Sequence, residues 1–116
     1  MAIIIGTDED LRQVTFNHPF VAVKYHNDNY PICKELYPIY EKLSQQKKYH
    51  DITFVRVAAE ENPVAQKLIE KDVYSFMAIY KKGLLLESRT ISSEQDIKEL
   101  LAKLLEVIKA PSMKLS

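Results

Sequence analysis

The segment Phe20-Val21-Ala22-Val23-Lys24-Tyr25 constrains the fold of this chain more than any other part of the sequence. β-Branched and aromatic residues dominate it and Pro19 precedes it, so the pattern predicts a β-strand. Only Lys24 interrupts its apolar character. A strand that is apolar on both sides needs cover on both sides, which is typical of parallel or mixed sheets carrying helices on each face.

Further strands and helices alternate on either side of this segment. Apolar runs predict strands at 3–5, 52–57, 76–80 and 84–88, and helical spacing predicts helices at 8–14, 31–46, 63–71 and 93–110. The capping-box pattern of Ser92 with Gln95 predicts the start of the last helix. The order β-α-β-α-β-α-β-β-α predicts one α/β domain over residues 1–110, with a five-stranded mixed sheet covered by helices on both faces. We expect residues 111–116 to form a disordered tail.

Charge and hydropathy exclude several classes of partner. Sixteen basic residues balance sixteen acidic ones, so the broad positive field needed for nonspecific binding of nucleic acids or anionic membranes is absent. No apolar run has the length of a membrane span. The short apolar start has no basic residues before it and acidic residues after it, unlike a signal peptide, so we expect a cytoplasmic protein.

The scarcity of glycine and cysteine excludes several chemistries. The two glycines, Gly6 and Gly83, are far apart, so no phosphate-binding loop, dinucleotide fingerprint or nucleophile elbow exists. The three histidines show no zinc-ligand spacing with one another or with Cys33. We therefore expect no cofactor and no metal. Cys33 is the single cysteine, which excludes an intramolecular disulfide.

A set of landmarks makes nearly the whole chain resemble the thioredoxin family, beyond the order of elements. Val23-Lys24-Tyr25 is similar to the strand that leads into the family's active site, and Tyr30-Pro31-Ile32-Cys33-Lys34 occupies the place of its Cys-Gly-Pro-Cys-Lys motif. Pro38 matches the proline that kinks the second helix. Asn62-Pro63 matches the opening of the third helix, and Lys81-Lys82-Gly83 resembles the hairpin turn. The agreement of these landmarks in register supports the resemblance.

The departures from the family pattern bear on function. Tyr30 stands where the family has its nucleophilic cysteine, and Cys33 matches the resolving one. Ser75 falls at the family's cis-proline, or Met77 if the alignment shifts by two, so neither alignment keeps a proline. Dithiol exchange needs an acidic thiol and a second thiol, and a tyrosine hydroxyl supplies neither.

The resemblance therefore implies a redox-silent module that binds a protein or peptide through the former active-site face. The expected contact residues are Tyr30, Pro31, Ile32, Tyr74, Ser75 and Phe76. Tyr74 and Phe76 have an alternative role as packing residues against the helices. The alternative function is a residual thiol oxidoreductase or weak peroxidase that uses Cys33 alone, so enzymatic activity stays open with absence favoured. The oligomeric state is also open.

Two cations are expected near Cys33. Lys24 replaces the family's buried aspartate and Arg56 matches that aspartate's lysine partner, so the resemblance points both toward the face beneath the second helix. Burial of both needs an acid, for which Glu60 and Glu61 are candidates, or else the side chains reach water along their aliphatic stems. Cations and a helix N-terminus lower a thiol pKa, whereas desolvation raises it. Cys33 is accordingly either an acidic thiol or a small core residue.

Overall fold

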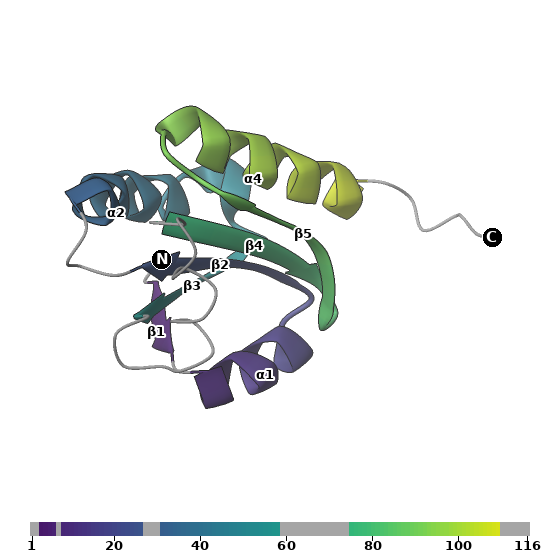
Figure 1. Cartoon of the computed structure of the whole chain (residues 1–116). Helices are drawn as coiled ribbons and strands as arrows, with labels where there is room; N and C mark the ends of the chain where they lie inside the picture. Colours follow the sequence, from purple (N-terminus) through teal and green to yellow (C-terminus); the bar gives the residue numbers. More distant parts are fainter. Residues whose placement is uncertain (1–2, 7, 27–30, 59–74, 110–116) are drawn as a thin grey trace.

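A computed structural model describes residues 3–6, 8–26, 31–58 and 75–109 and has a mixed sheet between two layers of helices (Figure 1). The sheet has five strands in the order β1-β3-β2-β4-β5. Strands β1 (Ile4–Gly6), β2 (Phe20–His26) and β3 (Thr53–Ala58) are parallel. Strands β4 (Ser75–Lys81) and β5 (Leu84–Thr90) complete the sheet as an antiparallel pair, with β4 antiparallel to β2.

The helices divide between the two faces of the sheet. Helix α1 (Asp8–Asn17) covers one face, and α2 (Pro31–Ser44) and α4 (Glu94–Lys109) cover the other (Figure 1). The helix expected at 63–71 lies outside the described residues. Within the described ranges, no helix is both long and apolar enough to cross a membrane.

Two helices end at residues other than those predicted. Helix α1 continues beyond Val14 to Asn17, and the His18 N–H donates to the Val14 carbonyl at 3.0 Å. Helix α2 stops at Ser44, before the predicted Gln46, because the chain tightens there: the Gln46 N–H donates to the carbonyl three residues back, at 3.1 Å. A short 3-10 helix, η1 (Lys47–Tyr49), follows.

Strand β2 lies at the centre of the sheet and is buried on both faces, as its sequence predicts. Val21, Val23 and Tyr25 point toward α1 and pack with residues of β3 and β4. Ala22 points toward α2 and α4. The alternation follows from the two-residue period of a strand, which sends successive side chains to opposite faces.

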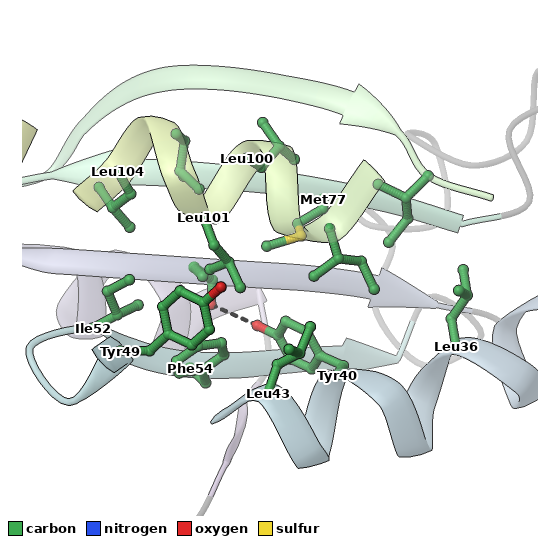
Figure 2. Packing of buried hydrophobic residues seen from close by; sticks show 14 residues of the cluster. Leu36, Tyr40, Leu43, Tyr49, Ile52, Phe54, Met77, Leu100, Leu101 and Leu104 are labelled. Atoms are coloured by element: carbon green, nitrogen blue, oxygen red, sulfur yellow. Dashed lines mark hydrogen bonds between the residues drawn. The ribbon is translucent and has the colours of Figure 1, made fainter. Parts of the chain in front are cut away.

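Helices α2 and α4 bury their apolar stripes in one common core against the sheet. Figure 2 shows this core, to which α2 contributes Leu36, Tyr40 and Leu43, and α4 contributes Leu100, Leu101 and Leu104. The spacing of both sets is that of one helical face. Tyr49 of η1 and Phe54 of β3 close the core, with their ring centroids 6.3 Å apart.

The turn between β4 and β5 is the predicted hairpin. Lys82 has a φ of 49° and Gly83 a φ of 84°, so both turn residues adopt the left-handed conformation. This is the conformation of the two-residue turns whose twist matches that of the flanking strands. A bulge interrupts the pairing beyond the turn, because Tyr80 lies opposite Leu85 whereas Ile79 lies opposite Glu87.

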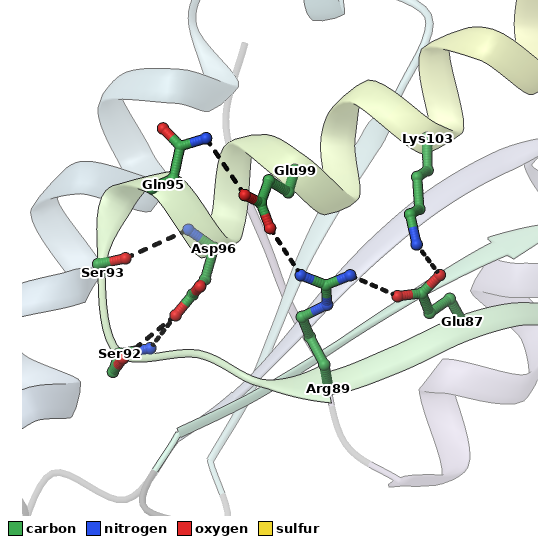
Figure 3. Close-up of polar contacts among 8 residues, drawn as sticks. All are labelled: Glu87, Arg89, Ser92, Ser93, Gln95, Asp96, Glu99 and Lys103. Atoms are coloured by element: carbon green, nitrogen blue, oxygen red, sulfur yellow. Dashed lines mark hydrogen bonds and ion pairs between the residues drawn. The ribbon is translucent and has the colours of Figure 1, made fainter.

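The residue that caps helix α4 lies one position later than predicted. Ser93 caps it, with its hydroxyl accepting a hydrogen bond from the Asp96 N–H at 3.3 Å. The Asp96 carboxylate accepts in return from the Ser92 N–H at 2.8 Å, and Gln95 has no part in this exchange (Figure 3). The predicted pairing of Ser92 with Gln95 is therefore wrong by one position. Aspartate provides the reciprocal acceptor because its carboxylate also favours the positive helix start.

A chain of charged side chains ties α4 to the exposed strand β5 (Figure 3). Glu87 accepts hydrogen bonds from Lys103 at 2.6 Å and from Arg89 at 2.7 Å. Arg89 also donates to Glu99 at 2.9 Å. These hydrogen bonds lower the pKa of Glu87 below its usual value, the contact with Lys103 contributing most.

Candidate functional site

The start of α2 lies at the end of the sheet where the parallel strands finish. Pro31 and Cys33 belong to the first turn of this helix, and it follows β2 after the short connection 27–30. Ser75 is the first residue of β4 and pairs with His26, the last residue of β2. The structure therefore brings the start of α2 and the start of β4 to the same end of the molecule.

Some of the predicted contact residues cannot be placed. Tyr30 and Tyr74 lie outside the described residues, as do the acids Glu60 and Glu61. Ile32 is in the first turn of α2 together with Pro31 and Cys33.

Phe76 packs partly into the sheet's valine-rich face. It lies opposite Tyr25 in the β2–β4 register, and the two ring centroids are 5.8 Å apart. Phe76 is half-buried and packs with the cluster on the α1 face. Phe76 thus packs against this cluster and keeps part of its surface accessible.

Lys24 and Arg56 lie side by side on the face covered by α2. The two residues are register partners in the parallel pair β2–β3, so their side chains leave the sheet in the same direction. Met77, the β4 partner of Lys24, is fully buried in the core beneath α2 and α4. Lys24 itself is fully buried.

Helix α2 covers the Arg56 guanidinium with an aromatic ring. The Arg56 Cζ atom lies 4.2 Å from the centroid of the Tyr37 ring. Such a contact is attractive because the ring face carries partial negative charge, and the flat guanidinium stacks well on it. Arg56 is half-buried, so the ring replaces part of the water around the charge.

A buried hydroxyl joins α2 to the centre of the sheet. The Tyr40 Oη lies 2.9 Å from the carbonyl oxygens of Ala22 and of Val55, which belong to the neighbouring strands β2 and β3. Burial raises the pKa of Tyr40 far above its ordinary value, so this group stays a neutral donor. Sequence reasoning missed it, because Tyr40 simply occupies the apolar stripe of α2 and its hydroxyl gives no separate signal.

The chemistry available at this end of the sheet is cationic and aromatic. In the described part of the chain, no group of three or more histidine, cysteine or acidic side chains is arranged to hold a metal ion. Cys33 is the one sulfhydryl of the sequence. Dithiol–disulfide exchange oxidises two thiols of one chain to a disulfide, and this chain supplies only one of the two.

Comparison with known proteins agrees with the topology and with the sequence landmarks. Residues 3–106 match the thioredoxin family model. The chain belongs to the thioredoxin family. No curated protein matches its sequence.

Solved thioredoxins share the fold at low sequence identity. Plasmodium falciparum thioredoxin is 20% identical with a TM-score of 0.76, and the match covers 87% of this chain and 98% of that one. Malassezia sympodialis thioredoxin is 16% identical with a TM-score of 0.78, over 90% of this chain and 91% of the other. Spinach chloroplast thioredoxin f is 18% identical with a TM-score of 0.76, over 88% and 92%. The scaffold is thus that of a thioredoxin, while its site residues need their own interpretation.

Proposed function

We propose that this thioredoxin-family protein binds a protein or peptide partner at the end of the sheet where α2 begins, and does not catalyse dithiol–disulfide exchange. The observation that carries the proposal is the single cysteine. Reduction of a disulfide by a thioredoxin moves two electrons, and two enzyme thiols become one disulfide. A lone thiol stops at the mixed disulfide, since no second thiol attacks it.

The surroundings of Cys33 support the same proposal. By the family register, Lys24 stands in the place of the buried aspartate that assists proton transfer at this cysteine. The structure has Lys24 fully buried under the α2 face, beside Arg56. A lysine side chain has no carboxylate oxygen, so the acceptor that an aspartate would provide at this position is missing. The residual site therefore lacks the proton acceptor as well as the second thiol.

Turnover is tested by the reduction of insulin disulfides with dithiothreitol as electron source. We expect the wild-type protein to give the same rate as dithiothreitol alone. Tyr30→Cys is the matched control, because it restores two cysteines at the family's spacing, and it should form an intramolecular disulfide. A wild-type protein that accelerates the reaction would contradict the loss of exchange activity.

The binding role is tested by affinity capture from the native host followed by quantification of each captured protein. We expect a partner that the wild type retains and that Tyr30→Ala loses roughly tenfold, the scale of an aromatic hot spot. Lys48→Ala, at an exposed position of η1 before the start of β3, should retain it. Equal capture by all three proteins would contradict a partner site at the start of α2.

Cys33 also supports a second candidate function, that of a lone reactive thiol. Its place in the first turn of α2 favours the thiolate through the helix dipole, and the adjacent face carries Lys24. A peroxide oxidises such a thiolate to a sulfenic acid, and external thiols then reduce the sulfenic acid in two steps.

Alkylation of Cys33 by iodoacetamide between about pH 6 and pH 9 separates the two functions. A reactive thiol with a pKa below that of free cysteine, raised in Lys24→Asp, supports the thiol function. A thiol that is unreactive in both proteins shows that Cys33 is a packing residue. Binding is then the remaining candidate function.

A further inference from the structure

The large apolar side chains that the described part of the chain exposes gather at the end of the sheet opposite the start of α2. Phe16 is 81% exposed, Leu84 67%, Leu85 50% and Leu86 37%. Phe16 lies in the last turn of α1, and the three leucines begin β5. Strand β4 separates this end from Ser75 by its full length, roughly 20 Å.

Backbone contacts hold the two segments together. The Lys82 N–H in the hairpin turn donates to the Pro19 carbonyl just after α1, at 2.8 Å. Gly83 and Phe16 line one groove of about 490 Å³, together with Arg12, Gln13, Thr15 and Asn17. Figure 1 shows the turn beside the end of α1. Phe16 thus borders a hollow beside the hairpin turn, large enough to take a bulky side chain.

The strand register places Leu85 on the α1 side of the sheet, whereas Leu84, in register with Lys81 and Phe20, lies on the side of α2 and α4. Leu85 lies opposite Tyr80, which packs with the valine cluster beneath α1, so Leu85 emerges on that side. Leu86 is the additional residue of the bulge. A bulge on an edge strand disturbs continuous strand pairing, so it disfavours the addition of further strands to this edge.

Cations lie beside the groove and in the hairpin turn. Arg12 lines the groove, and Lys81 and Lys82 precede Gly83. None of these three forms an ion pair with another described residue. Glu87, the nearest acid along β5, accepts hydrogen bonds from Lys103 and Arg89. A ligand at this surface therefore meets apolar side chains and cations that form no ion pair with the described acids.

We propose that this α1–hairpin surface, made of Phe16, Leu85 and Leu86 with the cations Arg12 and Lys82, binds an acidic protein segment. The segment inserts a bulky apolar side chain into the groove and sets flanking carboxylates against the cations. This surface is separate from the partner site proposed at the start of α2.

Two other occupants fit the observations less well. A second copy joined by two-fold symmetry would bring the cations of one surface against the same cations of the other. A bilayer surface is flat and cannot fill a groove, although it shares the negative charge. The acidic segment satisfies both the charge and the shape.

The test uses the whole protein and two acetylated peptides that share a leucine and phenylalanine core. One peptide has glutamate and aspartate flanks, and its control has lysine flanks. Titration followed by backbone amide NMR shifts should show binding of the acidic peptide alone, weakened by salt, with the largest shifts at Phe16 and residues 83–86. Binding of both peptides alike, of neither, or at the start of α2 overturns the proposal.

Variants locate the contribution of charge and of apolar contact. Arg12→Glu should lower the affinity for the acidic peptide roughly tenfold, and so should Phe16→Ala. Lys48→Glu is the matched control, since it changes the net charge equally at another exposed site, and it should leave the affinity within about twofold. Equal weakening by Lys48→Glu would overturn the proposal, because only net charge would then matter.

Two further measurements expose the competing occupants. Co-sedimentation with phosphatidylcholine vesicles, with and without phosphatidylserine, should show no binding. Sedimentation velocity should show no self-association of the wild type. The contrary result is a self-association that Leu85→Glu abolishes. Either effect in the absence of peptide binding assigns the surface to a membrane or to a second copy, and overturns the proposal.

Discussion

The two faces of strand β2 differ in chemistry although their residues alternate along one strand. Toward α1, Val21 and Val23 meet Val55 and Val57 in a mainly aliphatic layer that also holds Tyr25. Toward α2, the same strand buries Lys24, next to Arg56 and close to the hydroxyl-bearing ring of Tyr40. Polar atoms are thus concentrated on the face where α2 begins. The difference shows that the aliphatic face serves stability, whereas the polar face combines stability with the environment of the site.

Moving a lysine to the aliphatic face should break the fold. Val23→Lys should destabilise the protein by about 4 kcal/mol or more, because neighbouring valines offer no acceptor to a buried ammonium. Thermal unfolding followed by circular dichroism measures the loss. The control is Val23→Met, which has a similar length without charge and should cost less than about 2 kcal/mol. Equal losses in both variants would show that size, rather than charge, separates the faces.

The buried hydroxyl on the polar face should have a measurable effect on stability. Tyr40→Phe removes the donor that lies 2.9 Å from two carbonyl oxygens and should cost about 1–2 kcal/mol in urea unfolding. Tyr49→Phe is the matched control, because Tyr49 is also buried against Phe54. Within the described residues, the Tyr49 hydroxyl makes no comparable hydrogen bond, so its loss should cost less than about 0.5 kcal/mol.

The stacking of Arg56 on Tyr37 should make a smaller contribution. Arg56→Lys keeps the charge and removes the planar guanidinium, and should cost about 0.5–1 kcal/mol. A double-mutant cycle with Tyr37→Leu isolates the contact itself. A coupling energy near zero in that cycle would mean that Tyr37 merely covers Arg56.

The smallest effect is expected outside both layers, where ion pairs join β5 to α4. The folded-state pKa of Glu87 lies below its usual value of 4.5, chiefly because Lys103 donates to its carboxylate. Its stabilising contribution is therefore complete above about pH 4.5 and disappears as pH falls through the lowered pKa. Glu87→Gln should cost less than about 1 kcal/mol at neutral pH and nothing in acid. An equal cost at both pH values would mean that the contact is not electrostatic.

The mixed sheet and its helices followed from local sequence patterns. An apolar run of β-branched residues predicted β2, and alternating strands and helices predicted cover on both faces. Lys82-Gly83 predicted the hairpin, because the backbone conformation of this turn suits glycine. Helix ends were less well predicted. The cap of α4 moved from Ser92 to Ser93 because adjacent serines offer nearly equivalent local choices, and hydrogen bonds to Asp96 select between them.

The sequence by itself determined the fold class and the lone thiol of Cys33, since these depend on composition and on local periodicity, and the resemblance to the thioredoxin family implied the adjacency of Lys24 and Arg56. Only the tertiary structure decided that Tyr40 reaches two strands and that Tyr37 covers Arg56. It alone joined Phe16 to the β4–β5 turn. Periodicity specifies which face a residue occupies, but contacts between distant segments depend on how elements pack and where turns meet, and no local pattern encodes that.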